Sequence, residues 1–288
     1  MPSAADFQTE ANARDLVSKY VVLVQEHLGV LQPAPAAGTR QQLAAATYQL
    51  HFTVSTVATV RTIVAVDVYT AAQGGSLPLY FLPWCQNAAT EMTIPAGGGG
   101  PGIFMTSMLS GCTVQVHGTA TNPTITHANS RQSYDDAYNQ MQGFLGTQGL
   151  SAQEVHNGSE TRGNSAATGA INTMLPQGVN ARTVRKRDYV GKLTPDHLTA
   201  AKSRFNETLS YKTWETLSKY EVAKSGAFKP KTGAFVYGLR DVHNQWSFFY
   251  QAAVEVDIQV SPFAGYYGDT VNYTMDSAVL GPPARFFP

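Results

Sequence analysis

The sequence predicts an α+β protein, in which strands and a few helices follow one another without regular alternation. Strands are indicated where apolar and polar residues alternate, first within residues 48–69 and again towards the C-terminus. Helices are indicated where apolar residues recur every three or four positions. Because the two patterns do not alternate as β-α-β units would, a doubly wound parallel sheet is not expected.

Length and charge limit the classes of protein to consider. The chain has 288 residues, of which 43% are hydrophobic, so we expect one domain over residues 1–288 with a sizeable core. Twenty basic and twenty acidic residues cancel, so net charge does not support nucleic acid or an anionic membrane as a partner. No apolar run approaches the ~20 residues of a membrane span. Residues 1–6 lack the basic and apolar regions of a cleavable signal, and we expect a soluble chain.

The N-terminal part is predicted to be a helix over about residues 11–31. Its apolar residues share one face, and the pattern ends before a Pro/Ala-rich linker at residues 33–38. That face consists of Leu16, Val17, Tyr20, Val21, Val24 and Leu28. Strands are then predicted within residues 48–69 and at residues 77–84.

The run of glycine and proline at residues 97–102 is predicted to be irregular, because glycine loses more conformational entropy on ordering than any other residue. The run lacks the Lys-Ser/Thr pair that ends a phosphate-binding loop. We expect a flexible linker or rim beside the cysteine site described below.

Further along the chain, helices are predicted over residues 130–145 and from Thr194 towards Tyr220, with Pro195 in the first turn. Residues 154–179 are polar and rich in Gly, Asn and Thr, which predicts a long surface loop. The basic cluster at residues 182–187 is interpreted as a solvated strand or loop, and docking to an acidic patch of a protein target is the alternative.

The C-terminal region is predicted to contain one hairpin and an irregular tail. Residues 235–240 and 246–260 form the hairpin, joined by a turn that exposes His243. Residues 261–288 are rich in Pro, Gly and aromatic residues without periodicity, which predicts a tail held over the body by its aromatic side chains.

One of the two cysteines stands in a setting that suggests chemistry. Cys112 precedes an alternating run and is followed, fifteen residues later, by His127 at the end of another. A hairpin centred on Thr119 and Ala120 would place Cys112 directly opposite His127, with both side chains on one face. His117 would project to the other face. Since an imidazole commonly activates a thiol, Cys112 and His127 are a candidate nucleophile and base.

The same segment resembles a known family. Residues 109–112 match the Leu-Ser-Gly-Cys signature of the protein-glutamine deamidases typified by the cytotoxic necrotizing factor catalytic domain and a bacterial lethal factor. The resemblance covers about residues 99–129. It implies that Cys112 is the nucleophile and His127 its base, and that Thr106, six residues before the cysteine, completes the site. In part of the family a backbone carbonyl takes this third role. The resemblance also implies a central β-sandwich of mixed sheets surrounded by helices and long loops, and a secreted or injected toxin or effector.

This resemblance implies deamidation of a glutamine in a target protein through a thioester. The oxyanion would be held by backbone N–H groups around Ser110, Gly111 and Thr113. We expect a cationic His127 or local backbone amides to lower the pKa of Cys112 below the ~8.5 of a free thiol. The chemistry needs no cofactor, and no His, Cys and Asp cluster has metal-ligand spacing. The partner would be a protein substrate that carries a reactive glutamine.

Other interpretations stay open. Cys112 can be an inert core residue in a non-catalytic protein-binding domain on the same scaffold, since free cysteine is usually a small hydrophobe. A Cys-His protease would contain the same pair, and an amine that intercepts the thioester would give transglutamination. Cys85 lies in an aromatic-rich run and is interpreted as a core residue. A disulfide between the two cysteines would disable the nucleophile.

Overall fold

The computed structural model describes residues 3–26, 35–56, 62–70, 74–197, 199–200, 220–222, 228–262 and 271–288. Two mixed β-sheets and several helices form the described parts, so the predicted α+β class is confirmed. No helix among the described residues is both long and apolar enough to cross a membrane.

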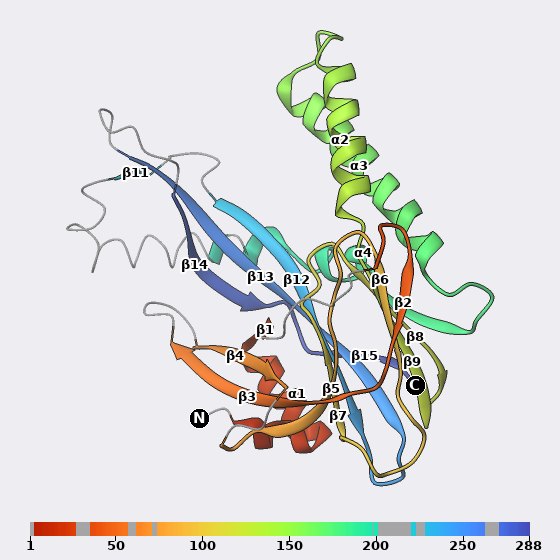
Figure 1. The fold of residues 1–288 in the computed structure, drawn as a ribbon. Coiled ribbons are helices and arrows are strands. Elements are labelled where there is room, and N and C mark those ends of the chain that lie inside the picture. Colours follow the sequence, from red (N-terminus) through yellow and green to blue (C-terminus); the bar gives the residue numbers. More distant parts are fainter. Residues whose placement is uncertain are drawn as a thin grey trace.

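The larger sheet has ten strands (Figure 1). Eight follow the order β1-β4-β3-β5-β7-β12-β13-β11, and β14 and β15 also pair with β13. The strands are β1 (Val21–Glu26), β3 (Thr47–Thr56), β4 (Thr62–Tyr69), β5 (Leu77–Leu82), β7 (Ile103–Thr106), β11 (Tyr220–Val222), β12 (Phe228–Arg240), β13 (Trp246–Pro262), β14 (Val271–Val279) and β15 (Ala284–Phe287). The predicted strands within 48–69 and 77–84 and the predicted hairpin are present.

The smaller sheet has five strands in the order β10-β8-β9-β6-β2. They are β2 (Arg40–Leu43), β6 (Ala89–Thr93), β8 (Thr113–Thr119), β9 (Asn122–Ala128) and β10 (Ala181–Val184). The described helices are η1 (Ala4–Gln8), α1 (Glu10–Lys19), α2 (Arg131–Leu145), α3 (Ala152–Met174) and α4 (Lys186–Val190). The predicted helix at 130–145 is confirmed, with Ser130 at its N-cap position.

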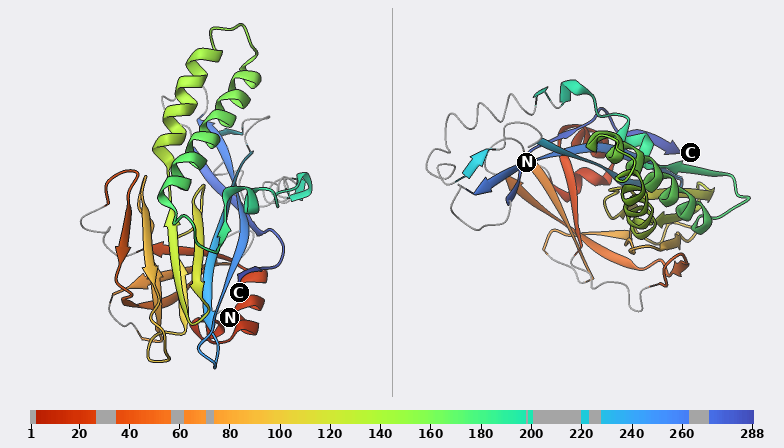
Figure 2. Two further views of the ribbon diagram at one scale, coloured as in Figure 1. Left: turned by 90° about the vertical axis from the view of Figure 1, so that its right-hand side faces the viewer. Right: turned by 90° about the horizontal axis from the view of Figure 1, so that it is seen from above.

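The two sheets pack face to face around a shared apolar core, which makes the predicted β-sandwich (Figure 2). The side chains of β5 point alternately to the two faces of the larger sheet, and each face packs against another layer. Tyr80 and Leu82 point into the core between the sheets, whereas Leu79 and Phe81 pack with the α1 residues Leu16 and Val17 on the other face. Helices α2 and α3 form a hairpin that rises from one end of the body (Figure 1).

The predicted N-terminal helix over 11–31 is correct only in its first half. Helix α1 ends at Lys19, and the next residues form β1, which pairs in parallel with β4. Val21, Val22 and Val24 favour a strand because β-branched side chains pack well in a pleated sheet. The remainder of that prediction, residues 27–31, lies outside the described residues.

The predicted surface loop at 154–179 is wrong, because α3 covers most of it. Ser151 and Glu154 form a capping box that starts the helix. Its glycines permit close packing against α2: a Cβ on Gly163 would lie 2.8 Å from the Tyr134 ring. Composition suggested a loop, but contact with the neighbouring helix makes these residues helical.

The predictions for the part of the chain after residue 180 have mixed outcomes. The irregular tail at 261–288 is wrong where β14 and β15 pair with β13, because strand pairing satisfies backbone groups that composition alone left unassigned. Residues 182–187 fall in β10 and the start of α4. His243 is exposed, as expected. Most of the helix predicted from Thr194 to Tyr220 lies outside the described residues.

The glycine-rich run is held by an arginine far from the cysteine. Arg240 donates from its guanidinium to the carbonyl oxygens of Gly97, Gly98 and Gly100. The cysteine loop instead meets β12 at Ala234, through paired backbone bonds with Leu109. Six strand residues, about 20 Å, separate these points on β12. The run is irregular, as predicted, but the prediction of a rim beside the site is wrong.

Candidate active site

The β8–β9 hairpin has a tighter turn than the sequence suggested. Thr119 pairs with Asn122, which leaves a loop of two residues, and Val114 pairs with His127. The predicted pairing of Cys112 with His127 is therefore wrong by two residues. Gly118 has a φ of 90° and lies within β8, where a Cβ would come 2.7 Å from the Asn122 carbonyl oxygen. This glycine allows a close backbone approach inside the strand and does not form part of the turn.

A register shift of two residues keeps every side chain on its face. His127 lies opposite Val114, which points into the core between the sheets. Cys112 stands two positions before Val114 and belongs to the same core. The candidate nucleophile and base therefore share the inner face, as diagonal neighbours about 7–8 Å apart at the backbone. His117 has the opposite parity and lies on the outer face, near Glu91 and Arg40.

His127 is completely buried and is held by Thr106 of the opposite sheet. The Thr106 hydroxyl lies 2.7 Å from Nδ1 of His127, and it donates to the Leu82 carbonyl oxygen at 2.7 Å. Because a hydroxyl has only one hydrogen, Thr106 must accept from Nδ1–H of His127. That bond assigns the neutral tautomer with an unprotonated Nε2. Nε2 is buried and has no hydrogen-bond partner among the described residues, Cys112 included.

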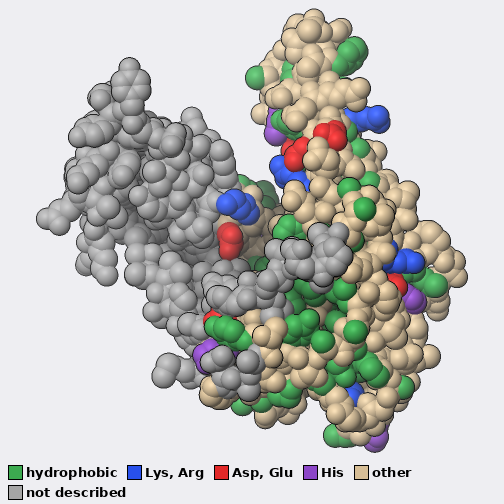
Figure 3. Space-filling view, viewed as in Figure 1, with side chains coloured by type: hydrophobic (Ala, Val, Ile, Leu, Met, Phe, Trp, Pro, Cys, Tyr) green, Lys and Arg blue, Asp and Glu red, His purple; other side chains and the backbone are tan. Residues whose placement is uncertain are grey.

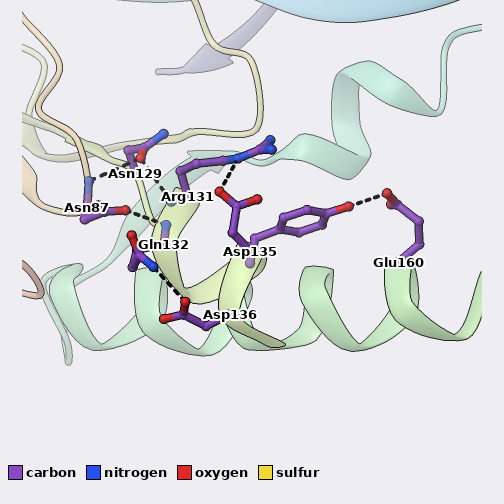
Figure 4. Close-up of polar contacts among 8 residues, drawn as sticks. Asn87, Asn129, Arg131, Gln132, Asp135, Asp136 and Glu160 are labelled. Carbon is purple, nitrogen blue, oxygen red and sulfur yellow. Dashed lines mark hydrogen bonds and ion pairs between the residues drawn. The ribbon is translucent and has the colours of Figure 1, made fainter. Parts of the chain in front are cut away.

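The Cys112 sulfur has an asparagine as its partner. Asn129 donates from Nδ2 to Sγ at 3.1 Å. Its Oδ1 accepts the backbone N–H groups of Asn87 at 3.3 Å and Arg131 at 3.2 Å (Figure 4). Since those two donors require an oxygen, the amide nitrogen must face the sulfur. Ser110 adds a backbone N–H towards the same sulfur. Both donors stabilise a thiolate over a thiol.

The loop before the cysteine depends on a glycine and a tyrosine. Gly111 has a φ of 96°, a conformation that only glycine adopts without strain. The buried Tyr189 of α4 accepts the Gly111 N–H at 2.8 Å and donates to the Cys112 carbonyl oxygen at 3.3 Å. The Gly111 N–H is therefore engaged, and Gly111 supports the loop in this structure. Thr113 is buried at the start of β8.

Burial sets the protonation of the pair. It lowers the pKa of His127 to about 3, so the imidazole is neutral at pH 7. Burial also raises the pKa of the Cys112 thiol, although Asn129 and the Ser110 backbone lower it in part. The expectation that His127 depresses the pKa of Cys112 is wrong for this structure, because a neutral imidazole offers no positive charge to a thiolate. A neutral thiol and a neutral base thus face one core, and attack on a substrate would need proton transfer between them.

A pocket of about 640 Å³ adjoins the cysteine loop. Its floor includes Ser110, Gly111, Thr113 and Asn129, and its walls come from α2, α3, residues 185–187 and the start of β12. The volume is typical of small-ligand and peptide sites. Cys112 is 3% exposed and does not line this pocket, but Asn129, which does, donates to its sulfur.

The structure brings together Thr106, Cys112 and His127 on the inner face and the Ser110–Gly111 loop beside them. It adds Asn129 and Tyr189, which sequence reasoning missed. Asn129 lies next to Cys112 because the turn has two residues, and Ala120 and Thr121 are not of the Asn-Gly type that would have indicated such a turn. Tyr189 lies 77 residues from its partner, and no local pattern pointed to it.

The described residues contain no group of three or more His, Cys, Asp or Glu side chains that could hold a metal ion. Both cysteines are free, so no disulfide joins them. No protein-family model matches this sequence, and a comparison with curated proteins finds no match either.

Proposed function

We propose that this protein is a cysteine-dependent protein-glutamine deamidase of the Leu-Ser-Gly-Cys type, acting as a toxin or effector. The observation that carries the proposal is the hydrogen-bond chain from the Leu82 carbonyl through Thr106 to His127. Among the described residues it leaves Nε2 of a neutral imidazole as a base without a partner, on the same face as Cys112. Both alternatives for the third member of the site take part in this chain of hydrogen bonds. The Thr106 hydroxyl contacts the imidazole, and the Leu82 backbone carbonyl accepts from that hydroxyl.

The reaction proceeds in two halves. Nε2 of His127 accepts the Sγ proton of Cys112 as the sulfur attacks the carboxamide carbon of the glutamine. His127 then returns that proton to the nitrogen, ammonia leaves, and a thioester remains. In the second half His127 deprotonates water, which attacks the thioester, and the protonated His127 then returns this proton to the departing sulfur. The products are glutamate and the free thiol.

The resting arrangement supports a site that adjusts when substrate binds. Cys112 is 3% exposed, so the pocket floor must shift for a glutamine side chain to reach the sulfur. The Asn129 amide already points at Sγ and is suited to donate to the developing oxyanion beside it. A donor of this kind typically contributes about 10²–10³ in rate.

The test is a comparison of wild type with Cys112→Ser in cell lysates that contain candidate targets. We expect ammonia release and a glutamine-to-glutamate mass shift at one or a few sites with wild type only. Cleaved chains in place of mass shifts would indicate a protease, and incorporation of an added amine would indicate a transglutaminase. Equal spectra for both proteins would refute a cysteine-dependent enzyme on these targets.

A non-catalytic protein-binding domain is the second candidate, and the burial of Cys112 favours it. Burial raises the pKa of this thiol, as it would for an inert core cysteine. In that case Cys112→Ser would capture the same partner as wild type, and no protein in the lysate would accelerate the modification of Cys112. Iodoacetamide labelling with and without lysate separates the candidates, since an enzyme must expose its sulfur when a target binds.

A further inference from the structure

The pocket beside the cysteine loop is strongly basic, although the chain as a whole is neutral. Five of its lining side chains are cationic and one is a carboxylate: Arg131, Arg185, Lys186, Arg187, Lys231 and Glu160. The full sequence contains twenty basic and twenty acidic residues. A local excess of one sign in a concave surface selects ligands of the opposite sign.

Several of these cations are held in place. Lys186 donates from Nζ to Asn164 at 2.8 Å and lies 5.6 Å from the centre of the Tyr134 ring. Arg131 lies 5.1 Å from the same ring and pairs with Asp135 at 2.8 Å. Contacts of this kind reduce the entropy that the side chains lose when a ligand binds.

Carboxylates near the pocket offset part of its charge. Glu255 lies directly opposite Lys231 in the β12–β13 ladder, and Asp135 pairs with Arg131. Glu160 accepts a hydrogen bond from the Tyr134 hydroxyl. Arg187 lies 3.9 Å from Asp188, and its side chain is 81% exposed. Within the described ranges no carboxylate lies at ion-pair distance from Arg185 or Lys186. On the face shown in Figure 3, charged side chains lie on the part of the helical hairpin nearer the body.

We propose that this pocket binds an acidic segment of the substrate protein next to the target glutamine. The proposal rests on the deamidase function proposed above and names its substrate class. Ser110, Gly111, Thr113 and Asn129 line the same pocket as these cations, so a peptide bound among the cations would bring a neighbouring residue to the cysteine loop. For residues 185–187, which line the pocket, we adopt the interpretation that the basic cluster docks to acidic groups.

The first experiment measures binding without turnover. Short synthetic peptides with one glutamine flanked by Asp and Glu, by Ser and Ala, or by Lys and Arg are titrated against Cys112→Ser by fluorescence anisotropy. We expect acidic peptides to bind about tenfold more tightly than neutral ones at low salt, and the preference to shrink as salt rises. Equal affinities for acidic and neutral peptides would overturn the proposal.

Charge variants identify the cations responsible. Lys186→Gln removes one held cation, and Arg187→Glu reverses an exposed charge with little risk to folding. Each should weaken acidic-peptide binding about threefold to tenfold. Arg182→Glu is the matched control, since Arg182 is exposed, belongs to the same basic cluster and does not line the pocket. An equal loss in the Arg182 variant would mean that overall charge, and not this pocket, sets the preference.

Turnover on the same peptides separates this proposal from the one on which it rests. If acidic peptides bind more tightly but wild type releases no ammonia from them, the proposed acidic subsite stands and the proposed deamidase activity does not. If wild type releases ammonia equally from acidic and neutral peptides, the deamidase activity stands and the acidic subsite does not. Tighter binding of an oligonucleotide of equal charge than of the acidic peptides would overturn the subsite as a peptide site.

Discussion

The surroundings of the two cysteines differ in a way that burial alone does not reveal. Both thiols are free and buried, and burial raises the pKa of both. The Cys112 sulfur receives the side-chain amide of Asn129 and shares the inner sheet face with His127. Among the described residues, Cys85 has only the backbone of Gln86 as a polar partner, with Sγ 3.9 Å from the carbonyl oxygen. Directed donors from other elements, together with a base on the same face, distinguish a candidate nucleophile from a core thiol.

The largest expected effect is on activity after replacing each thiol. Cys112→Ser should lower ammonia release by about 10³ or more, because a neutral hydroxyl is a much weaker nucleophile than sulfur. Cys85→Ser should retain activity within about twofold. Ammonia release from purified variants on an identified substrate measures both, with circular dichroism as the check on folding. Equal losses in the two variants would remove the distinction.

The next effect concerns the histidines of the β8–β9 hairpin. His127→Ala should lower turnover by about 10²–10⁴, the usual contribution of a general base. His117→Ala should remain within about threefold of wild type, because His117 lies on the outer face. Steady-state kinetics of both variants provide the test. An essential His117 with a dispensable His127 would contradict the observed parity of the strand.

A smaller loss is expected when the support of His127 is removed. Thr106→Val keeps the volume but deletes the hydroxyl that accepts from Nδ1, so the tautomer with a free Nε2 is no longer favoured. We expect kcat to fall about 10- to 100-fold, below the full contribution of the base. Thr124→Val is the control, because Thr124 lies on β9 with His127 but points to the outer face of the smaller sheet. If both variants lose activity equally, the hydroxyl of Thr106 has no special role.

Thiol titration sharpens the comparison further. Burial raises the pKa of Cys112, so alkylation should titrate above the ~8.5 of a free thiol. Asn129→Ala removes a donor to the thiolate and should raise that pKa further. Asn87→Gly serves as the control, because it removes only a bond to the Gln132 backbone and suits the φ of 59° at this position. Rates of iodoacetamide modification against pH, read at Cys112 and Cys85 by mass spectrometry, decide the matter. A lower pKa in Asn129→Ala would contradict the assignment of the amide.

The last expected effect concerns stability, which should depend on pH. The pKa of His127 is about 3 in the folded protein, against an ordinary value of 6.5. Between these values the unfolded chain binds more protons, so the free energy of unfolding should fall as pH falls, by at most about 1.4 kcal/mol per pH unit from this group. Urea unfolding of wild type and His127→Gln at pH 4 to 7 isolates the contribution. His243→Gln, at an exposed turn, should leave the slope unchanged.

Local patterns in the sequence were sufficient for much of the scaffold. Alternation located β3, β4, β5 and the β12–β13 hairpin, and apolar spacing located α2. These signals work because one buried face imposes its period on the side chains. The same parity placed Cys112 and His127 on one face and His117 on the other, even though the predicted register was wrong.

What only the tertiary structure decided depends on partners distant in sequence. Helix α3 packs on α2, strand β1 pairs with β4, and strands β14 and β15 pair with β13. No local pattern in the sequence identifies these partners. The site follows the same division. The sequence by itself determined the nucleophile, its base and the threonine as candidates, together with their shared face. The fold decided that Asn129 faces the sulfur, that Tyr189 holds the loop, and that burial keeps thiol and imidazole neutral. Solvation and hydrogen-bond geometry are set by the whole surroundings of a residue, and a linear pattern does not contain them.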